Sequence, residues 1–114
     1  MYRIIQALHD SELFSDITIV ELIDEEQVRL LKVKAILNDG SLLYITELHT
    51  SDYQKYSYHW QKTNGELLIR WDNKSHWKQL ATFPDHKHEG GNVHPSPRVS
   101  IDDVLLEIKK KYNS

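Results

Sequence analysis

The 114-residue sequence contains no cysteine, which excludes disulfide bonds, a thiol nucleophile and any metal centre held by cysteine. Because secreted domains of this size often depend on disulfides, the absence favours a cytoplasmic protein. No run of about 18 apolar residues is present, so we expect no membrane-spanning helix. Charged and polar residues interrupt the first apolar stretch within a few positions, which is unlike a secretory signal peptide.

Glycine and proline are scarce, and the sequence has no Gly-rich phosphate-binding loop, nucleotide-binding fingerprint or Ser-His-Asp hydrolase elbow. These absences set aside dehydrogenase, kinase and P-loop chemistry. The formal net charge of -3 does not favour nucleic-acid binding by bulk charge, so an RNA contact would need a local basic patch. With 39% apolar and 27% charged residues the chain is typical of a globular protein, and residues 1–114 are expected to form one domain.

Strand patterns separated by turn residues fill the middle of the chain. Asp39-Gly40 and Asn64-Gly65 predict tight hairpin turns, because glycine accepts a positive φ angle without a Cβ clash. Ahead of the strands, the helical spacing of Ile4, Ile5 and Leu8 predicts a short helix over residues 2–13. About five strands are expected, in an antiparallel meander, over residues 16–23, 28–37, 42–49, 55–62 and 66–72.

The regular pattern stops over residues 73–99, a segment that contains all 3 prolines and four of the 7 histidines. This segment is predicted to be a long functional loop, anchored on the sheet by Trp77 and Phe83. Ser100 and Asp103 then have the spacing of a capping box at the start of a C-terminal helix. The predicted fold class is therefore α+β: a short helix, about five antiparallel strands, a histidine-rich loop and a second helix.

The histidine-rich segment carries the residues best suited to chemistry. It contains His76, His86, His88 and His94, and it follows Arg70 and Asp72 directly. Because imidazole titrates near pH 6.5, two such rings can divide the general-acid and general-base roles. That division suits RNA cleavage, in which the 2′-OH is an internal nucleophile. We predict that His86 and His88 form the acid–base pair, that Arg70 stabilises the phosphate, and that His76 and Asp72 support them.

Other interpretations of the same residues stay open. His-x-His together with His76 or Asp72 could make a three-ligand metal site, and loop histidines are often simply solvated. Lys87, between the two histidines, is a candidate substrate contact.

The tyrosines of the fourth predicted strand have two interpretations. The stripe of Tyr56, Tyr58 and Trp60 is either part of the core or an exposed surface on which unpaired bases stack. In the second case Tyr58 would bind substrate. Tyr58 and His59 lie on opposite faces of a regular strand, so both cannot enter one site unless a bulge intervenes.

Three segments resemble the TumE-like toxins of bacterial and archaeal toxin–antitoxin modules: YSYHWQ (Tyr56–Gln61), GELLIRWDN (Gly65–Asn73) and ATFPDHKHEGG (Ala81–Gly91). The Arg-x-Asp-Asn and Phe-Pro-x-His-Lys-His motifs carry the resemblance, which spans about half of the chain. One position departs from the family pattern. Relatives tend to have a His-His pair after the Asp-Asn motif, whereas this chain has His76-Trp77, so the second histidine is not available.

The resemblance implies a small toxin encoded beside a helix-turn-helix antitoxin. By analogy with other small toxins built on antiparallel sheets, it implies an RNA target that is cleaved without a metal cofactor. Two rival functions remain: a non-catalytic protein-interaction module that uses the sheet edge or the aromatic face, and a histidine-ligated metal protein. Exposed edge strands would also allow a homodimer.

Overall fold

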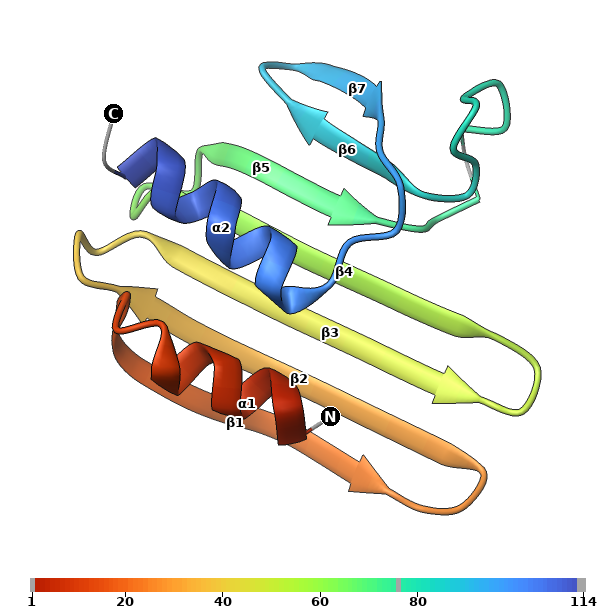
Figure 1. Cartoon of the computed structure of the whole chain (residues 1–114), viewed down its shortest axis with the longest axis horizontal. Coiled ribbons are helices and arrows are strands. Elements are labelled where there is room, and N and C mark those ends of the chain that lie inside the picture. The colour runs from red at the N-terminus through yellow and green to blue at the C-terminus, as the bar shows by residue number, and fades with distance from the viewer. Residues whose placement is uncertain (1, 76, 113–114) are drawn as a thin grey trace.

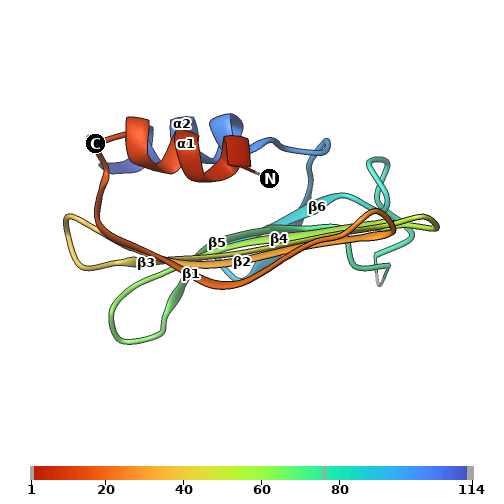
Figure 2. The same cartoon turned by 90° about the horizontal axis from the view of Figure 1, so that it is seen from below.

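The computed structural model describes residues 2–75 and 77–112, which form two helices and one antiparallel sheet (Figure 1). The sheet has seven strands in the order of the chain, so each strand pairs with the next one. The elements are α1 (Tyr2–Asp10), β1 (Phe14–Asp24), β2 (Val28–Leu37), β3 (Leu42–Thr50), β4 (Gln54–Gln61), β5 (Leu67–Asp72), β6 (His86–Glu89), β7 (Asn92–Pro95) and α2 (Ile101–Tyr112). Both helices lie on the same face of the sheet, and no helix of the described residues lies on the other face (Figure 2).

The α+β class, the antiparallel meander and the two terminal helices are confirmed, but the predicted count of about five strands is wrong. The two additional strands, β6 and β7, lie inside the segment that was predicted to be a loop. Gly90 and Gly91 make the turn between them, with φ angles of +62° and +77°. Each strand is only 4 residues long, and polar side chains point to both sides of β6, so no apolar alternation marks them in the sequence.

The two hairpin turns predicted at glycine are confirmed. Gly40 and Gly65 have φ angles of +89° and +92°, which disfavour any residue with a Cβ atom. The second turn joins β4 and β5, and a register shift between Trp60 and Gln61 lies between this turn and the pairs of Tyr58 with Trp71 and of His59 with Arg70. This register positions the candidate site described below.

The core lies between the sheet and the two helices. Alternate residues of each central strand point toward the helices, as the two-residue period of a strand requires. Each fully buried aliphatic side chain contributes about 1.5–3 kcal/mol. The buried strand residues are Leu31, Val33, Ala35, Leu37, Leu43, Ile45, Tyr56, Tyr58, Trp60, Ile69 and Trp71, and the helices add Ile4, Leu8, Ile101, Val104, Leu105 and Ile108.

The predicted capping box at the start of α2 is confirmed. The Ser100 amide donates to Asp103 Oδ2 at 2.9 Å, and the Asp103 amide donates to Ser100 Oγ at 3.2 Å. Farther along α2, Lys111 Nζ forms an ion pair with Glu89 of β6 at 2.8 Å. Within residues 2–75 and 77–112, no helix has the length and apolar character needed to cross a membrane.

Candidate functional site

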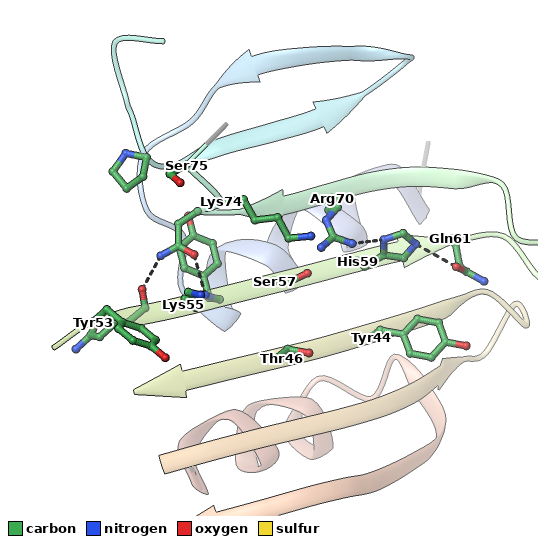
Figure 3. Close-up of a pocket in the computed structure, with 14 residues that line it drawn as sticks. Tyr44, Thr46, Tyr53, Lys55, Ser57, His59, Gln61, Arg70, Lys74 and Ser75 are labelled. Carbon is green, nitrogen blue, oxygen red and sulfur yellow. Dashed lines mark hydrogen bonds between the residues drawn. The ribbon is translucent and has the colours of Figure 1, made fainter. Parts of the chain in front are cut away.

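A row of four side chains crosses the helix-free face of the sheet. Tyr44 of β3 pairs with His59 of β4, His59 pairs with Arg70 of β5, and Arg70 pairs with His88 of β6. Paired residues of antiparallel strands point to the same face, so these side chains are neighbours. The close-up of this face shows Tyr44, His59 and Arg70 in front of the sheet, with the helices behind it (Figure 3). The row therefore places one guanidinium between two imidazoles.

Hydrogen bonds define the tautomer of His59. Arg70 Nη1 lies 3.1 Å from His59 Nδ1, and a guanidinium can only donate, so Nδ1 is the acceptor. The ring proton is then on Nε2, which donates to Gln61 Oε1 at 3.0 Å. Burial and the charge of Arg70 lower the pKa of His59, although the bond to Gln61 opposes the shift. His59 is therefore a neutral imidazole at neutral pH.

Asp72 is a buried carboxylate around which the polar groups of the site gather. Its Oδ2 accepts a hydrogen bond from Arg70 Nε at 2.8 Å, and its Oδ1 accepts one from the Lys74 amide at 3.0 Å. His86 Nε2 lies 2.8 Å from Oδ1, and His88 Nε2 lies 3.8 Å from Oδ2. A buried carboxylate requires such partners, because removing it from water without them is costly.

His86 is enclosed, with only 1% of the residue exposed. Its Nδ1 donates to the Pro84 carbonyl at 3.0 Å. Its Nε2 lies 2.8 Å from Asp72 Oδ1, but no described residue meets the geometry of a hydrogen bond to it. The ring of Trp77 packs edge-on against His86, with ring centroids 6.4 Å apart. The segment between β5 and β6 thus covers His86, which suits it to support the site rather than to contact a substrate.

His88, two residues along β6, is more open, with 27% of its side chain exposed. Its ring centroid lies 5.0 Å from that of His86 and 6.1 Å from that of Trp77. Burial lowers the pKa of His88; the carboxylate of Asp72 opposes the shift, and the nearby positive groups Arg70 and Lys74 add to it. A neutral and accessible imidazole can accept a proton, as a general base must.

The structure brings four of the predicted site residues together: Arg70, Asp72, His86 and His88. His76 lies outside the described residues. His94 is not in the row; its Nε2 lies 3.2 Å from the carbonyl oxygen of Glu89, on the β6–β7 hairpin.

The structure places two predicted substrate contacts away from the row. Tyr58 is 1% exposed on the helix-covered face, where its hydroxyl donates to Glu47 Oε1 at 2.5 Å, so it cannot stack on a base. Lys87 also points toward the helices, and its Nζ lies 3.2 Å from Glu107 Oε1 of α2. Both placements have one cause: neighbours of a site residue along a strand point to the opposite face.

His59 was not predicted as a site residue, although the sequence contains a signal for it. The hairpin turn at Asn64-Gly65 brings the strand of His59 beside that of Arg70, and a register shift between Trp60 and Gln61 sets the two residues opposite each other. The prediction instead followed the histidines that are close together in sequence.

Three ligand atoms in the site could hold a metal ion. One carboxylate oxygen of Asp72 and one ring nitrogen each of His86 and His88 lie within 4.8 Å of one another. Two imidazoles and a carboxylate suit several divalent transition metals. The guanidinium of Arg70, bound to the same carboxylate, places a positive charge beside this position.

Residues 3–112 match the model of the family described as Toxin TumE. The chain belongs to this toxin family. No curated protein and no solved structure gives a significant match. Membership covers nearly the whole chain, including the first half, and confirms the resemblance carried by the Arg-x-Asp-Asn and Phe-Pro-x-His-Lys-His motifs. It supports a toxin of a toxin–antitoxin module and implies an antitoxin as the partner.

Proposed function

We propose that this TumE-family toxin is an endoribonuclease that cleaves RNA by acid–base catalysis on the helix-free face of the sheet. The observation that supports the proposal is the cross-strand row in which Arg70 lies between His59 and His88. A phosphate bound by the guanidinium would have an imidazole on each side, the arrangement that a transesterification of RNA needs.

The proposed reaction follows from the protonation states. His88, neutral because of its lowered pKa, removes the proton of the 2′-OH, and the 2′ oxygen attacks the adjacent phosphorus. The bond from phosphorus to the 5′ oxygen breaks, and that oxygen receives a proton from His59. The products are a 2′,3′-cyclic phosphate and a 5′-OH end. Arg70 binds the non-bridging oxygens, where negative charge increases in the transition state.

His59 can act as the acid because substrate binding changes its surroundings. When Arg70 turns Nη1 toward a phosphate, His59 Nδ1 loses its donor, and the negative phosphate favours the protonated ring. Asp72 and His86 have a supporting role in this proposal, since Asp72 holds Arg70 through Nε. His86 is thereby moved from the predicted acid–base pair to the support of the site.

The test is induced expression in a host cell, with total RNA examined for fragments. We expect growth arrest and RNA cleavage for the natural chain, and neither for His88→Ala or His59→Ala. His94→Ala is the matched control, because His94 is a histidine of the same region that lies outside the row, and it should remain active. Circular dichroism confirms that each variant is folded. RNA cleavage by a folded His88→Ala protein would contradict the proposal.

A metal-dependent site is the second candidate, and the cluster of Asp72, His86 and His88, whose ligand atoms lie within 4.8 Å of one another, favours it. Elemental analysis of the purified protein separates the two candidates. Acid–base catalysis predicts cleavage that persists in a chelator and no stoichiometric metal. One equivalent of a transition metal, lost in Asp72→Asn together with the cleavage activity, would establish the metal site instead.

The partner proposal is more specific than the family membership. We expect a helix-turn-helix antitoxin, encoded beside the toxin, to suppress growth arrest when both are expressed.

The outer edge of β1 exposes Ile19, Val20 and Leu22, and it is a candidate surface for pairing with a second copy of the chain. Light scattering of the isolated protein tests the homodimer. The cytoplasmic location stays a prediction.

A further inference from the structure

The helix-free face is hollowed next to the row of His59 and Arg70. A groove of about 840 Å³ extends from Tyr44 on β3 across β4 to the segment that follows β5. The close-up shows Tyr44 and Tyr53 at opposite ends of this groove, with Lys55, Lys74 and Arg70 between them (Figure 3). The groove contains His59 and Arg70, so an occupant would lie directly against the proposed reaction centre.

The charge of the groove differs in sign from that of the whole protein. None of the 14 described residues that line it is acidic, while Lys55, Arg70 and Lys74 are cationic. The chain has 17 acidic residues among 114, so 14 average residues would include about two. The groove is thus the local basic patch that an acidic protein needs to bind a polyanion.

The ends of the groove present aromatic rings to solvent. Tyr44 is 36% exposed and packs edge-on near His59, with ring centroids 6.3 Å apart. Tyr53 is 47% exposed, and Lys55 Nζ lies 4.9 Å from the centre of its ring. Cations combined with exposed rings are the features by which proteins bind single-stranded nucleic acid, since phosphates contact the cations and bases stack on the rings.

The floor of the groove consists of small polar side chains. Thr46 and Ser57 pair across β3 and β4 in the middle of the groove, between the two tyrosines. These short side chains leave room above the sheet, and their hydroxyl groups can hydrogen-bond to sugar or base edges. A duplex conceals the faces of its bases, so the exposed rings fit only unpaired nucleotides.

We propose that this groove binds a short single-stranded segment of RNA, with bases stacked on Tyr44 and Tyr53 and phosphates held by Lys55 and Lys74. The proposal rests on the endoribonuclease function and assigns its substrate-binding surface and substrate class. It replaces Tyr58, which is buried, with two tyrosines of the opposite face. In this proposal the two tyrosine rings select single-stranded RNA over a duplex, and the two lysines determine where the RNA lies in the groove.

The experiment measures binding separately from cleavage. A fluorescent 2′-O-methyl RNA oligonucleotide has no 2′-OH nucleophile, so fluorescence anisotropy reports binding alone. We expect Tyr44→Ala to weaken binding by about 5- to 150-fold, the loss of one stacked base. Lys55→Gln with Lys74→Gln should reduce the slope of log K against log salt by about 1.4, since each phosphate contact contributes about 0.7. A duplex of the same sequence should bind more weakly than the single strand.

The matched control is Lys109→Gln with Lys110→Gln, which removes the same charge from the exposed end of α2 on the other side of the sheet. This control should bind as the natural chain does. Equal losses for control and groove variants, or equal binding of duplex and single strand, would overturn the groove assignment.

The two proposals fail differently. If the natural chain binds the oligonucleotide through the groove but does not cleave RNA, the assignment of the groove is supported and the endoribonuclease function is contradicted. If the natural chain cleaves RNA and the groove variants also bind and cleave it normally, the endoribonuclease function is supported and the assignment of the groove is contradicted.

Discussion

The two faces of strand β4 differ in what their polar groups do. Tyr58 points toward the helices, where its hydroxyl is bonded to buried Glu47. Its neighbour His59 points to the open face, where its ring contacts Arg70. Burial raises the pKa of Tyr58 and lowers that of His59, so both are neutral at pH 7. Only His59 can exchange its proton with a bound molecule, because only the open face can be reached by one.

The comparison teaches that one strand can serve stability and chemistry at once. Helices on one face supply the apolar area that holds the sheet together. The other face is then free to carry histidine, arginine and lysine side chains that contribute little to the core. A variant on each face should therefore affect a different property, and the following predictions test that separation.

The largest expected effect is on the covered face. Trp71→Ala removes a buried aromatic ring and should lower the free energy of unfolding by about 3–5 kcal/mol. Tyr44→Ala, on the open face, should change it by less than about 0.5 kcal/mol. Urea denaturation followed by circular dichroism measures both values. A large loss of stability for Tyr44→Ala would contradict the difference between the two faces, since side chains of the open face would then also stabilise the fold.

Asp72 and its cross-strand partner His86 are exceptions to this difference, because both point to the open face and are nevertheless buried. Asp72→Ala leaves Arg70 and His86 without their shared carboxylate and should cost about 3 kcal/mol. Asp72→Asn keeps the shape and should cost less. Denaturation of both variants gives the difference, and an unchanged stability of Asp72→Ala would mean that the carboxylate is not a structural centre of the site.

A smaller effect is expected at the start of α2. Ser100→Ala removes the hydroxyl that accepts from the Asp103 amide and should cost about 1 kcal/mol. RNA cleavage should be unchanged, since the cap lies on the helix side of the sheet. Thermal unfolding and the cleavage assay together check this prediction. Loss of cleavage without loss of stability would show that the two sides are coupled.

The smallest effect is the pH dependence of stability that comes from His59 and His88. Both have a folded-state pKa lowered from the ordinary value of about 6.5. The unfolded chain therefore binds more protons below that pH, and stability falls as pH decreases from about 6.5 toward the folded pKa values, then levels off. Urea unfolding at several pH values should show a shallower fall in the double variant His59→Gln and His88→Gln. A steeper fall in that variant would contradict the direction of the shifts.

Local sequence predicted those parts of the fold that depend on neighbours in the chain. The hairpin turns at Gly40 and Gly65, the Ser100 cap and the strand patterns before residue 73 depend on backbone preference and two-residue alternation. Strands β6 and β7 could not be predicted in this way. Strand β6 forms by pairing with β5, and its residue Glu89 forms an ion pair with Lys111 of α2. Both are contacts between segments that are distant in the sequence.

The sequence by itself determined that histidines, an arginine and an aspartate would gather near the end of β5, and that the chain is similar to TumE toxins. The tertiary structure decided the arrangement of the site. Pairing of β5 with β6 placed His88 beside Arg70, while Trp77 and the segment before β6 covered His86. Pairing of β4 with β5 added His59 to the row. The physical reason is that residue types and local periodicity reside in the sequence, whereas burial and cross-strand proximity arise only when distant segments pack.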